Sequence, residues 1–212
     1  MLYIFDWDGT LIDSTDKIAR CMQQAIAELG LPARSVEEVK SIIGLGLAQA
    51  VRTLFPDIEE AMIAKVTAAY SSHFVIADQT PCNLYPYVDE VLNQLRAEGH
   101  LLAVATGKSR RGLNRVLTNM SLTDFFDATR CADETASKPD PLMLHQLLQT
   151  LNVDVSAAVM VGDTDFDLEM AANAGMKSIG VSYGAHPVER LLPHKPERII
   201  DRFDQLLAGV KE

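Results

Sequence analysis

The chain has 212 residues, of which 48% are hydrophobic, which is enough to bury a core in one large domain or in a domain that carries a smaller insert. Its 19 Lys and Arg against 29 Asp and Glu give a formal net charge of -10, so a nucleic acid or an anionic membrane surface would be repelled on average. Cys21, Cys82 and Cys131 lack the spacing of a zinc site or a disulfide framework, and no apolar run reaches membrane length, so we expect a cytoplasmic protein with no nucleic-acid or membrane partner.

The first third of the chain predicts one short strand followed only by helices. Residues 2–5, LYIF, form an apolar run of strand length. From Ser14, an expected N-cap, apolar residues recur at helical spacing as far as Gly30. Ser35 and Glu38 form a capping box that begins a further helix. The stretch IIGLGL at 42–47 interrupts this pattern, which then resumes to 56 and again from 57 to about 76.

After residue 82 the pattern changes to alternating helices and strands. Expected helices span 86–98, 109–119, 140–151 and 165–174, and expected strands span 101–106, 126–130, 157–161, 178–181 and an edge strand at 197–200. Alternation of this kind, with apolar strands, predicts an α/β fold with a Rossmann-like, doubly wound parallel sheet. Residues 1–13 and 82–212 would form this core, and residues 14–81 would be an inserted helical segment.

Polar residues follow four of the expected strand ends or nearby loops. They are Asp6 and Asp8; Thr106 with Gly107 and Lys108; Lys138; and Asp163, Asp165 and Asp167. Ligands of open parallel sheets bind beyond the carboxyl ends of the strands, so these residues are expected to face one crevice. A calcium loop at 163–174 is excluded because Leu168 and Ala174 replace its required Gly and Glu. A P-loop ending at Lys108 is excluded because Leu102 stands where its first glycine is needed.

Several carboxylates in one crevice repel one another unless a cation compensates them. A hard divalent ion with oxygen ligands is the usual solution, and Mg²⁺ fits best because it keeps positions for water and a substrate phosphate. Thr106, the backbone amides near it and Lys138 could hold the remaining phosphate oxygens. The crevice is therefore expected to be a phosphoryl-transfer site.

Taken in order, the four segments resemble the motifs of the haloacid dehalogenase superfamily of phosphohydrolases. The resemblance covers nearly the whole chain, and it rests on the sequences DWDGTLIDS at 6–14, Thr106, Lys138 followed by Pro139, and GDTDFD at 162–167. The helical residues between the first two motifs look like the small cap of the phosphoglycolate phosphatase and beta-phosphoglucomutase branch. The resemblance implies a magnesium-dependent phosphatase that hydrolyses phosphate monoesters of small metabolites, with phosphoglycolate phosphatase as one candidate type, acting as a monomer or homodimer.

The resemblance also implies a role for each matching residue. Asp6 would be the nucleophile that forms an aspartyl phosphate, and Asp8 would protonate the leaving oxygen and then accept a proton from water. Mg²⁺ would bind the Asp6 carboxylate, the Asp8 backbone carbonyl and Asp163, with support from Asp167. The remaining matches would orient Asp6 or hold the phosphate, and these are Lys138, Thr106, Gly9 and Gly107.

Alternatives remain within and outside this superfamily. Asp8 favours ester cleavage over dehalogenation, but a phosphomutase or a phosphonatase stays open, as does a phospho-aspartyl signalling module without turnover. The stretch 42–47 is expected either to reach over the crevice and set specificity or simply to pack the helical insert. Lys108, Arg110 and Arg111 could touch the leaving group, although a solvated helix start is the default. No role is assigned to any histidine, and Trp7 is expected to point away from the two aspartates and pack.

Overall fold

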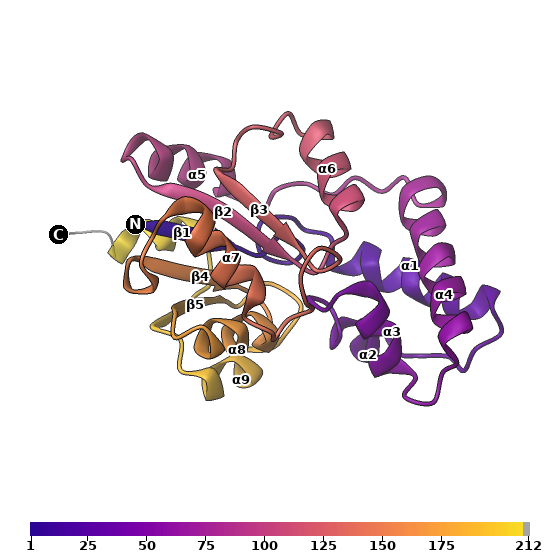
Figure 1. Cartoon of the computed structure of the whole chain (residues 1–212). Helices are drawn as coiled ribbons and strands as arrows, with labels where there is room; N and C mark the ends of the chain where they lie inside the picture. The colour runs from indigo at the N-terminus through magenta and orange to yellow at the C-terminus, as the bar shows by residue number, and fades with distance from the viewer. Residues whose placement is uncertain (210–212) are drawn as a thin grey trace.

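A six-stranded parallel sheet forms the centre of the protein in a computed structural model, which describes residues 1–209. The strand order is β3-β2-β1-β4-β5-β6, so β1 and β4 lie in the middle and β6 lies at one edge, as the sequence predicts for ERII. Figure 1 shows the sheet with helices on both sides. The strands are β1 (Leu2–Phe5), β2 (Leu101–Thr106), β3 (Ala128–Cys131), β4 (Ala158–Gly162), β5 (Lys177–Val181) and β6 (Arg198–Ile200).

Side chains that alternate along the strands fill two separate cores. Tyr3 and Phe5 of β1 pack on one face, against α5 (Val88–Ala97), α6 (Arg110–Asn119) and the short helix Phe203–Gly209. Leu2 and Ile4 pack on the other face, against α7 (Leu142–Leu151) and α8 (Asp165–Asn173). Both faces of the sheet are therefore covered, which confirms the doubly wound parallel fold.

The segment between β1 and β2 is helical and has a core of its own. Apolar side chains such as Met22, Val51 and Val66 are fully buried there. Figure 1 shows these helices to one side of the sheet, next to the carboxyl ends of its strands. The helices are α1 (Thr15–Glu28), α2 (Val36–Lys40), α3 (Leu47–Leu54), α4 (Glu60–Ser72) and a π-helical turn, His73–Ala77. The division into a core of 1–13 and 82–212 and an insert of 14–81 stays a prediction.

Most element boundaries agree with the sequence-based expectations, with three differences. The capping box of Ser35 and Glu38 is present. Ser14 is the N-cap residue of α1 as predicted, but its side chain makes no capping hydrogen bond, because its hydroxyl donates to Asp8 instead. The helix expected from residue 57 begins at Glu60 and widens into the π-helical turn near its end. The short helix α9 (Val188–Leu191) and the 3-10 turns Val155–Ala157, Leu192–His194 and Phe203–Gly209 were not predicted.

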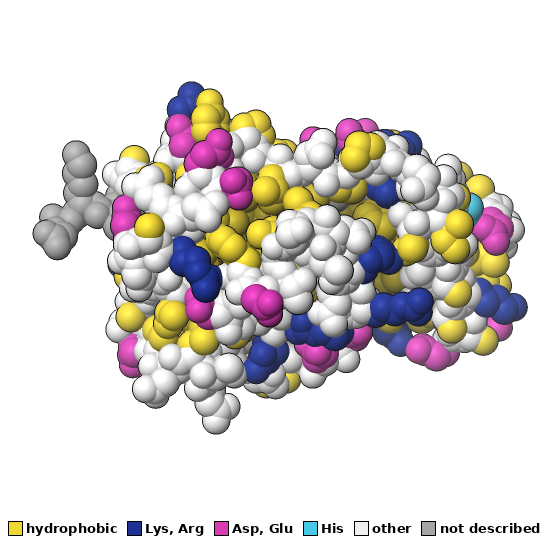
Figure 2. Space-filling model, turned by 90° about the horizontal axis from the view of Figure 1, so that it is seen from above, with side chains coloured by type: hydrophobic (Ala, Val, Ile, Leu, Met, Phe, Trp, Pro, Cys, Tyr) yellow, Lys and Arg dark blue, Asp and Glu magenta, His cyan; other side chains and the backbone are white. Residues whose placement is uncertain are grey.

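The surface carries charges of both signs. Figure 2 shows Lys and Arg interspersed with Asp and Glu over one face, without a continuous basic area. Within residues 1–209, no helix has both the length and the apolar character needed to cross a membrane.

Candidate active site

Three aspartates, two from neighbouring strand ends and one from the start of a helix, meet at the carboxyl edge of the sheet. Asp6 follows β1, Asp163 follows β4, and Asp167 lies in the first turn of α8. One carboxylate oxygen from each lies within 4.8 Å of the other two, and all three side chains are buried. They meet because β1 and β4 are paired in register, with Phe5 opposite Val161, and the Asp6 amide donates to the Val161 carbonyl at 3.0 Å.

Lys138 brings a positive charge into this group of acids. Its Nζ donates to Asp6 Oδ1 and to Asp167 Oδ1, both at 2.6 Å, and its side chain is fully buried. Burial alone would lower the pKa of Lys138, but the charges of Asp167 and Asp6 outweigh this effect and raise it. The lysine is therefore held charged between the two carboxylates.

Two of the three aspartates have partners for both of their oxygens. Asp163 accepts hydrogen bonds from the Thr10 hydroxyl and the Ala185 amide, both at 2.7 Å. Asp167 Oδ2 accepts from the amide and hydroxyl of Thr164, in a capping box at the start of α8. By contrast, Asp6 Oδ2 is buried and has no hydrogen-bond partner within residues 1–209. A buried, unpartnered carboxylate oxygen is costly unless a ligand completes it.

The electrostatics of this group also indicate a missing positive charge. Burial raises the pKa of Asp6 well above its usual range. The positive charge of Lys138 lowers this pKa, and the negative charges of Asp167 and Asp163 raise it further. Burial and the charge of Asp167 raise the pKa of Asp163 to about 6. Three carboxylates and one ammonium leave a formal charge of -2, which one divalent cation would balance. The donor set, which consists of oxygens only, suits Mg²⁺.

Glycines make room for these carboxylates. Gly9 has φ +90°, which an L side chain rarely adopts, and a Cβ at this position would collide with the Asp163 carboxylate. A Cβ at Gly184 would meet Asp163 in the same way, and one at Gly162 would meet Asp167. Gly9 thus lies with its backbone directly against Asp163, and its expected role in binding phosphate stays a prediction.

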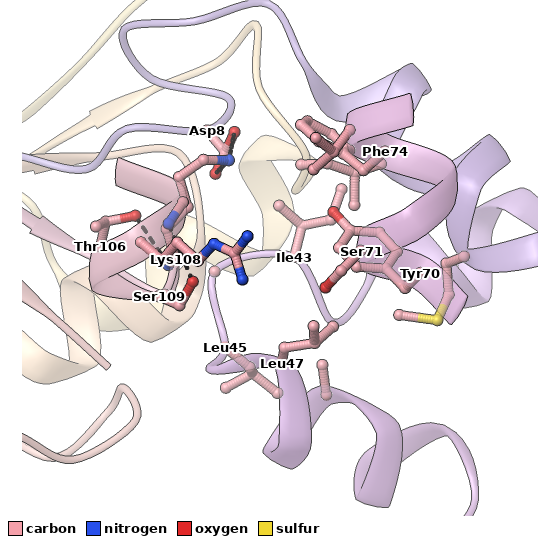
Figure 3. A pocket seen from close by; sticks show the side chains of 18 of the residues that line it. Asp8, Ile43, Leu45, Leu47, Tyr70, Ser71, Phe74, Thr106, Lys108 and Ser109 are labelled. Carbon is pink, nitrogen blue, oxygen red and sulfur yellow. Dashed lines mark hydrogen bonds and ion pairs between the residues drawn. The ribbon is translucent and has the colours of Figure 1, made fainter. Parts of the chain in front are cut away.

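Asp8 lies beside this group and has partners of its own. Lys108 Nζ donates to both of its carboxylate oxygens, at 2.8 and 2.7 Å, and the Ser14 hydroxyl donates to Oδ1 at 2.7 Å. Figure 3 shows Lys108 reaching Asp8 at the edge of a pocket. The expected solvated position of Lys108 is wrong, since its side chain is only 12% exposed.

The pocket lies between the sheet and the helical segment and has a volume of about 360 Å³. Asp6, Asp8 and Thr106 line it from the sheet, and Ile43 and Leu45 line it from the stretch 42–47. Thr106 is buried at the end of β2, and its Oγ1 accepts from the Lys108 amide at 3.2 Å, which leaves the hydroxyl hydrogen able to donate. The expected site residues are thus brought together at one end of the sheet.

The stretch 42–47 both packs and reaches the site. Ile42 and Ile43 are buried, and the Gly44 carbonyl lies so near Gly107 that a Cβ there would be 2.5 Å from its oxygen. The Gly46 amide also donates to the Ser137 hydroxyl at 2.9 Å. Gly107 therefore contacts the helical segment as well as the pocket.

Other residues singled out from the sequence lie outside the acid group. Arg110 pairs with Glu134 at 2.8 Å, while the exposed Arg111 lines the pocket. Asp165 turns away and pairs with Arg190 at 2.6 Å. Trp7 is buried and packs edge-on against Phe126, as its place between the aspartates predicts; the centroids are 6.1 Å apart.

Comparison with known proteins gives consistent matches over most of the chain. The family model described as "Haloacid dehalogenase-like hydrolase" matches residues 3–181. The protein named "Probable phosphatase IndB" of Dickeya dadantii (strain 3937) is 34% identical over 212 residues, which is 98% of this chain and 92% of that protein. A phosphoglycolate phosphatase of Vibrio parahaemolyticus is 31% identical over 218 residues, covering 99% of this chain and 95% of its own. The solved structure of a haloacid dehalogenase-like family hydrolase from Streptococcus pneumoniae superposes with a TM-score of 0.85 at 25% identity, covering 99% of this chain and 98% of its own.

Proposed function

The chain belongs to the haloacid dehalogenase-like hydrolases and is a phosphatase, and we propose that it hydrolyses phosphate monoesters of small metabolites with Mg²⁺ through a phosphorylated Asp6. The single observation that carries this proposal is the buried group of Asp6, Asp163, Asp167 and Lys138, in which one Asp6 oxygen has no partner within residues 1–209. The relatives named phosphoglycolate phosphatase make that ester one candidate substrate.

Mg²⁺ fits this group by charge and by donor chemistry. We assign the Asp6 carboxylate, the Asp8 backbone carbonyl and Asp163 as its ligands, with Asp167 nearby. Because Asp167 already accepts hydrogen bonds from Lys138 and Thr164, its part is to hold Lys138 toward Asp6. When bound, the ion offsets the negative charge of the carboxylates and of the transferring phosphoryl group.

Each residue of the site has its own part in the proposed reaction. An Asp6 oxygen attacks phosphorus while the bond to the leaving oxygen breaks, and Asp8 gives that oxygen a proton. Water then attacks the phosphorus, Asp8 takes its proton, and the bond to Asp6 breaks to release phosphate. Thr106 donates to a phosphate oxygen, and Lys138 orients Asp6 and offsets the developing charge.

The helical residues 14–81 act as a cap in this proposal. Their contacts with the sheet domain support this role, because the Gly46 amide bonds Ser137 and the Ser41 carbonyl lies 3.2 Å from His186 Nε2. A cap in this position covers the pocket and excludes water from the first step.

The experiment is hydrolysis of p-nitrophenyl phosphate by the wild type and by Asp6→Asn. Turnover should require Mg²⁺ and disappear in Asp6→Asn. Asp154→Asn, a matched change at an exposed aspartate that caps the short 3-10 turn Val155–Ala157, should keep the wild-type rate. Metal-independent turnover, or activity in Asp6→Asn, would contradict the proposal. A wild type that accepts a phosphoryl group from acetyl phosphate and keeps it would instead indicate a signalling module.

A further inference from the structure

The side of the pocket that faces the catalytic residues is apolar. Ile43 and Leu45 come from the stretch 42–47, Leu47 begins α3, and Tyr70 and Phe74 come from α4 and the π-helical turn. Figure 3 shows these side chains across the pocket from Asp8, Thr106 and Lys108. A leaving group attached to a phosphate at Asp6 would therefore extend toward this apolar wall.

The apolar wall has few polar groups and no charge. Among the described residues, the lining side chains of the helical segment with a polar atom are Tyr70, Ser71 and Ser72, and none of them is charged. The cations of the lining, Lys108, Arg111 and Arg115, all come from the sheet domain. Lys108 is already bound to Asp8 on both oxygens. A carboxylated or polyhydroxylated leaving group would lose its hydration against this wall without gaining partners there.

The aromatic pair gives the wall a shape that suits a ring. Tyr70 and Phe74 lie with centroids 5.7 Å apart and planes tilted by 33°. Lys17 Nζ lies 4.8 Å and Lys108 Nζ 5.1 Å from the Phe74 centroid, so of the pair it is Tyr70 that has no cation over its ring among the described residues. At about 360 Å³, the pocket falls within the range of roughly 300–1,000 Å³ that is common for sites of small molecules. It thus has space for a ring-sized group in addition to the phosphate.

We propose that the preferred substrates are phosphate monoesters of apolar, ring-bearing alcohols, whose body packs against Leu45, Leu47, Tyr70 and Phe74. This inference rests on the proposed phosphatase function and names its substrate class. The competing possibility is that Arg111 and Arg115 receive a carboxylate of the leaving group, as a small acid such as phosphoglycolate would present.

The first experiment compares esters of primary alcohols, so that the leaving groups differ in size and polarity more than in basicity. Values of kcat/KM with Mg²⁺ would be measured for ethyl, hexyl and 2-phenylethyl phosphate, for glycerol 3-phosphate and for phosphoglycolate. We expect kcat/KM to rise roughly fourfold for each added methylene that is buried, and 2-phenylethyl phosphate to exceed phosphoglycolate by about tenfold or more. Equal values for ethyl and 2-phenylethyl phosphate, or a preference for phosphoglycolate, would overturn the proposal.

The second experiment changes the wall. Leu47→Ser, at a half-buried lining position, should lower the ratio of kcat/KM for 2-phenylethyl over ethyl phosphate several-fold. Val36→Ser makes a matched change at an exposed position of the same helical segment that does not line the pocket, and it should leave the ratio at the wild-type value. A wild-type ratio in Leu47→Ser would overturn the proposal.

Binding of non-hydrolysable phosphonates separates this inference from the phosphatase function. Calorimetry with Mg²⁺ should show 2-phenylethylphosphonate binding about tenfold or more tightly than ethylphosphonate. If no ester is hydrolysed but this preference is found, the phosphatase function fails and the apolar pocket stands. If esters are hydrolysed and the two phosphonates bind equally, the apolar pocket fails and the phosphatase function stands.

Discussion

Replacing Lys138 with methionine tests whether its charge holds the acid group together. The substitution keeps an unbranched side chain, one atom shorter and uncharged, but removes two charged hydrogen bonds, to Asp6 and Asp167, at a fully buried position. Each such bond contributes about 1.5–3 kcal/mol, and removing one partner of a buried ion pair costs about 3–5 kcal/mol. We therefore expect Lys138→Met to lose about 3–5 kcal/mol of unfolding free energy without Mg²⁺.

Urea denaturation of four proteins would measure this effect as a cycle: the wild type, Lys138→Met, Asp167→Asn and the double variant. Because Asp167→Asn removes one of the charges that Lys138 compensates, the double variant should lose less than the sum of the single losses, by about 1–3 kcal/mol. Lys177→Met breaks an exposed pair with Glu197 and should cost at most about 1 kcal/mol. Single losses that add within about 0.5 kcal/mol would refute the coupling.

Three further predictions concern the metal, the cap contact and Asp8. The pKa of Asp163 is raised to about 6 without the ion, so a proton occupies its carboxylate increasingly as the pH falls below 6 and competes with Mg²⁺. Thermal shifts should therefore show weaker Mg²⁺ binding at pH 5.5 than at pH 7.5. Binding that does not depend on pH would contradict this prediction. In Gly107→Ala the new Cβ would lie 2.5 Å from the Gly44 carbonyl oxygen, and real Cβ contacts stay above 3.0 Å. The stretch 42–47 must therefore withdraw by about 0.5 Å, which should lower kcat/KM roughly tenfold. Full activity would show that the contact is not needed. Lys108→Gln should lower kcat several-fold with little change in Tm, because Asp8 loses the two charged hydrogen bonds that hold its carboxylate at the pocket edge. An unchanged kcat would show that Lys108 is not needed to position Asp8.

The order of elements could be predicted from the sequence because each strand end carries a local signal. The apolar run LYIF and the change from helical to alternating patterns after residue 82 define the parallel sheet, and the structure confirms it. The meeting of Asp6 with Asp163 follows from the same reasoning, since parallel strands bring their carboxyl ends to one edge.

Pairings between side chains had no such signal in the sequence. The position of Ser14 predicts an N-cap, yet its hydroxyl bonds Asp8. The chain turns back after β1, so these two residues are in contact although they lie six positions apart in the sequence. The sequence predicts a solvated Lys108 at a helix start, yet its ammonium group bonds Asp8 at the edge of the pocket. Both contacts depend on tertiary geometry, which neither periodicity nor spacing encodes.

The two ends of the helical segment leave the sheet domain side by side. The Asp13 amide donates to the Asn83 carbonyl at 2.9 Å, the Tyr85 amide donates to the Leu11 carbonyl at 3.0 Å, and Ile12 forms an antiparallel bridge with Leu84. The points where the chain enters and leaves the helical segment are thus hydrogen-bonded to each other as a short antiparallel pair. Helical modules of different length could be exchanged at this junction, by evolution or in chimaeras, while the sheet and its acids stay in place.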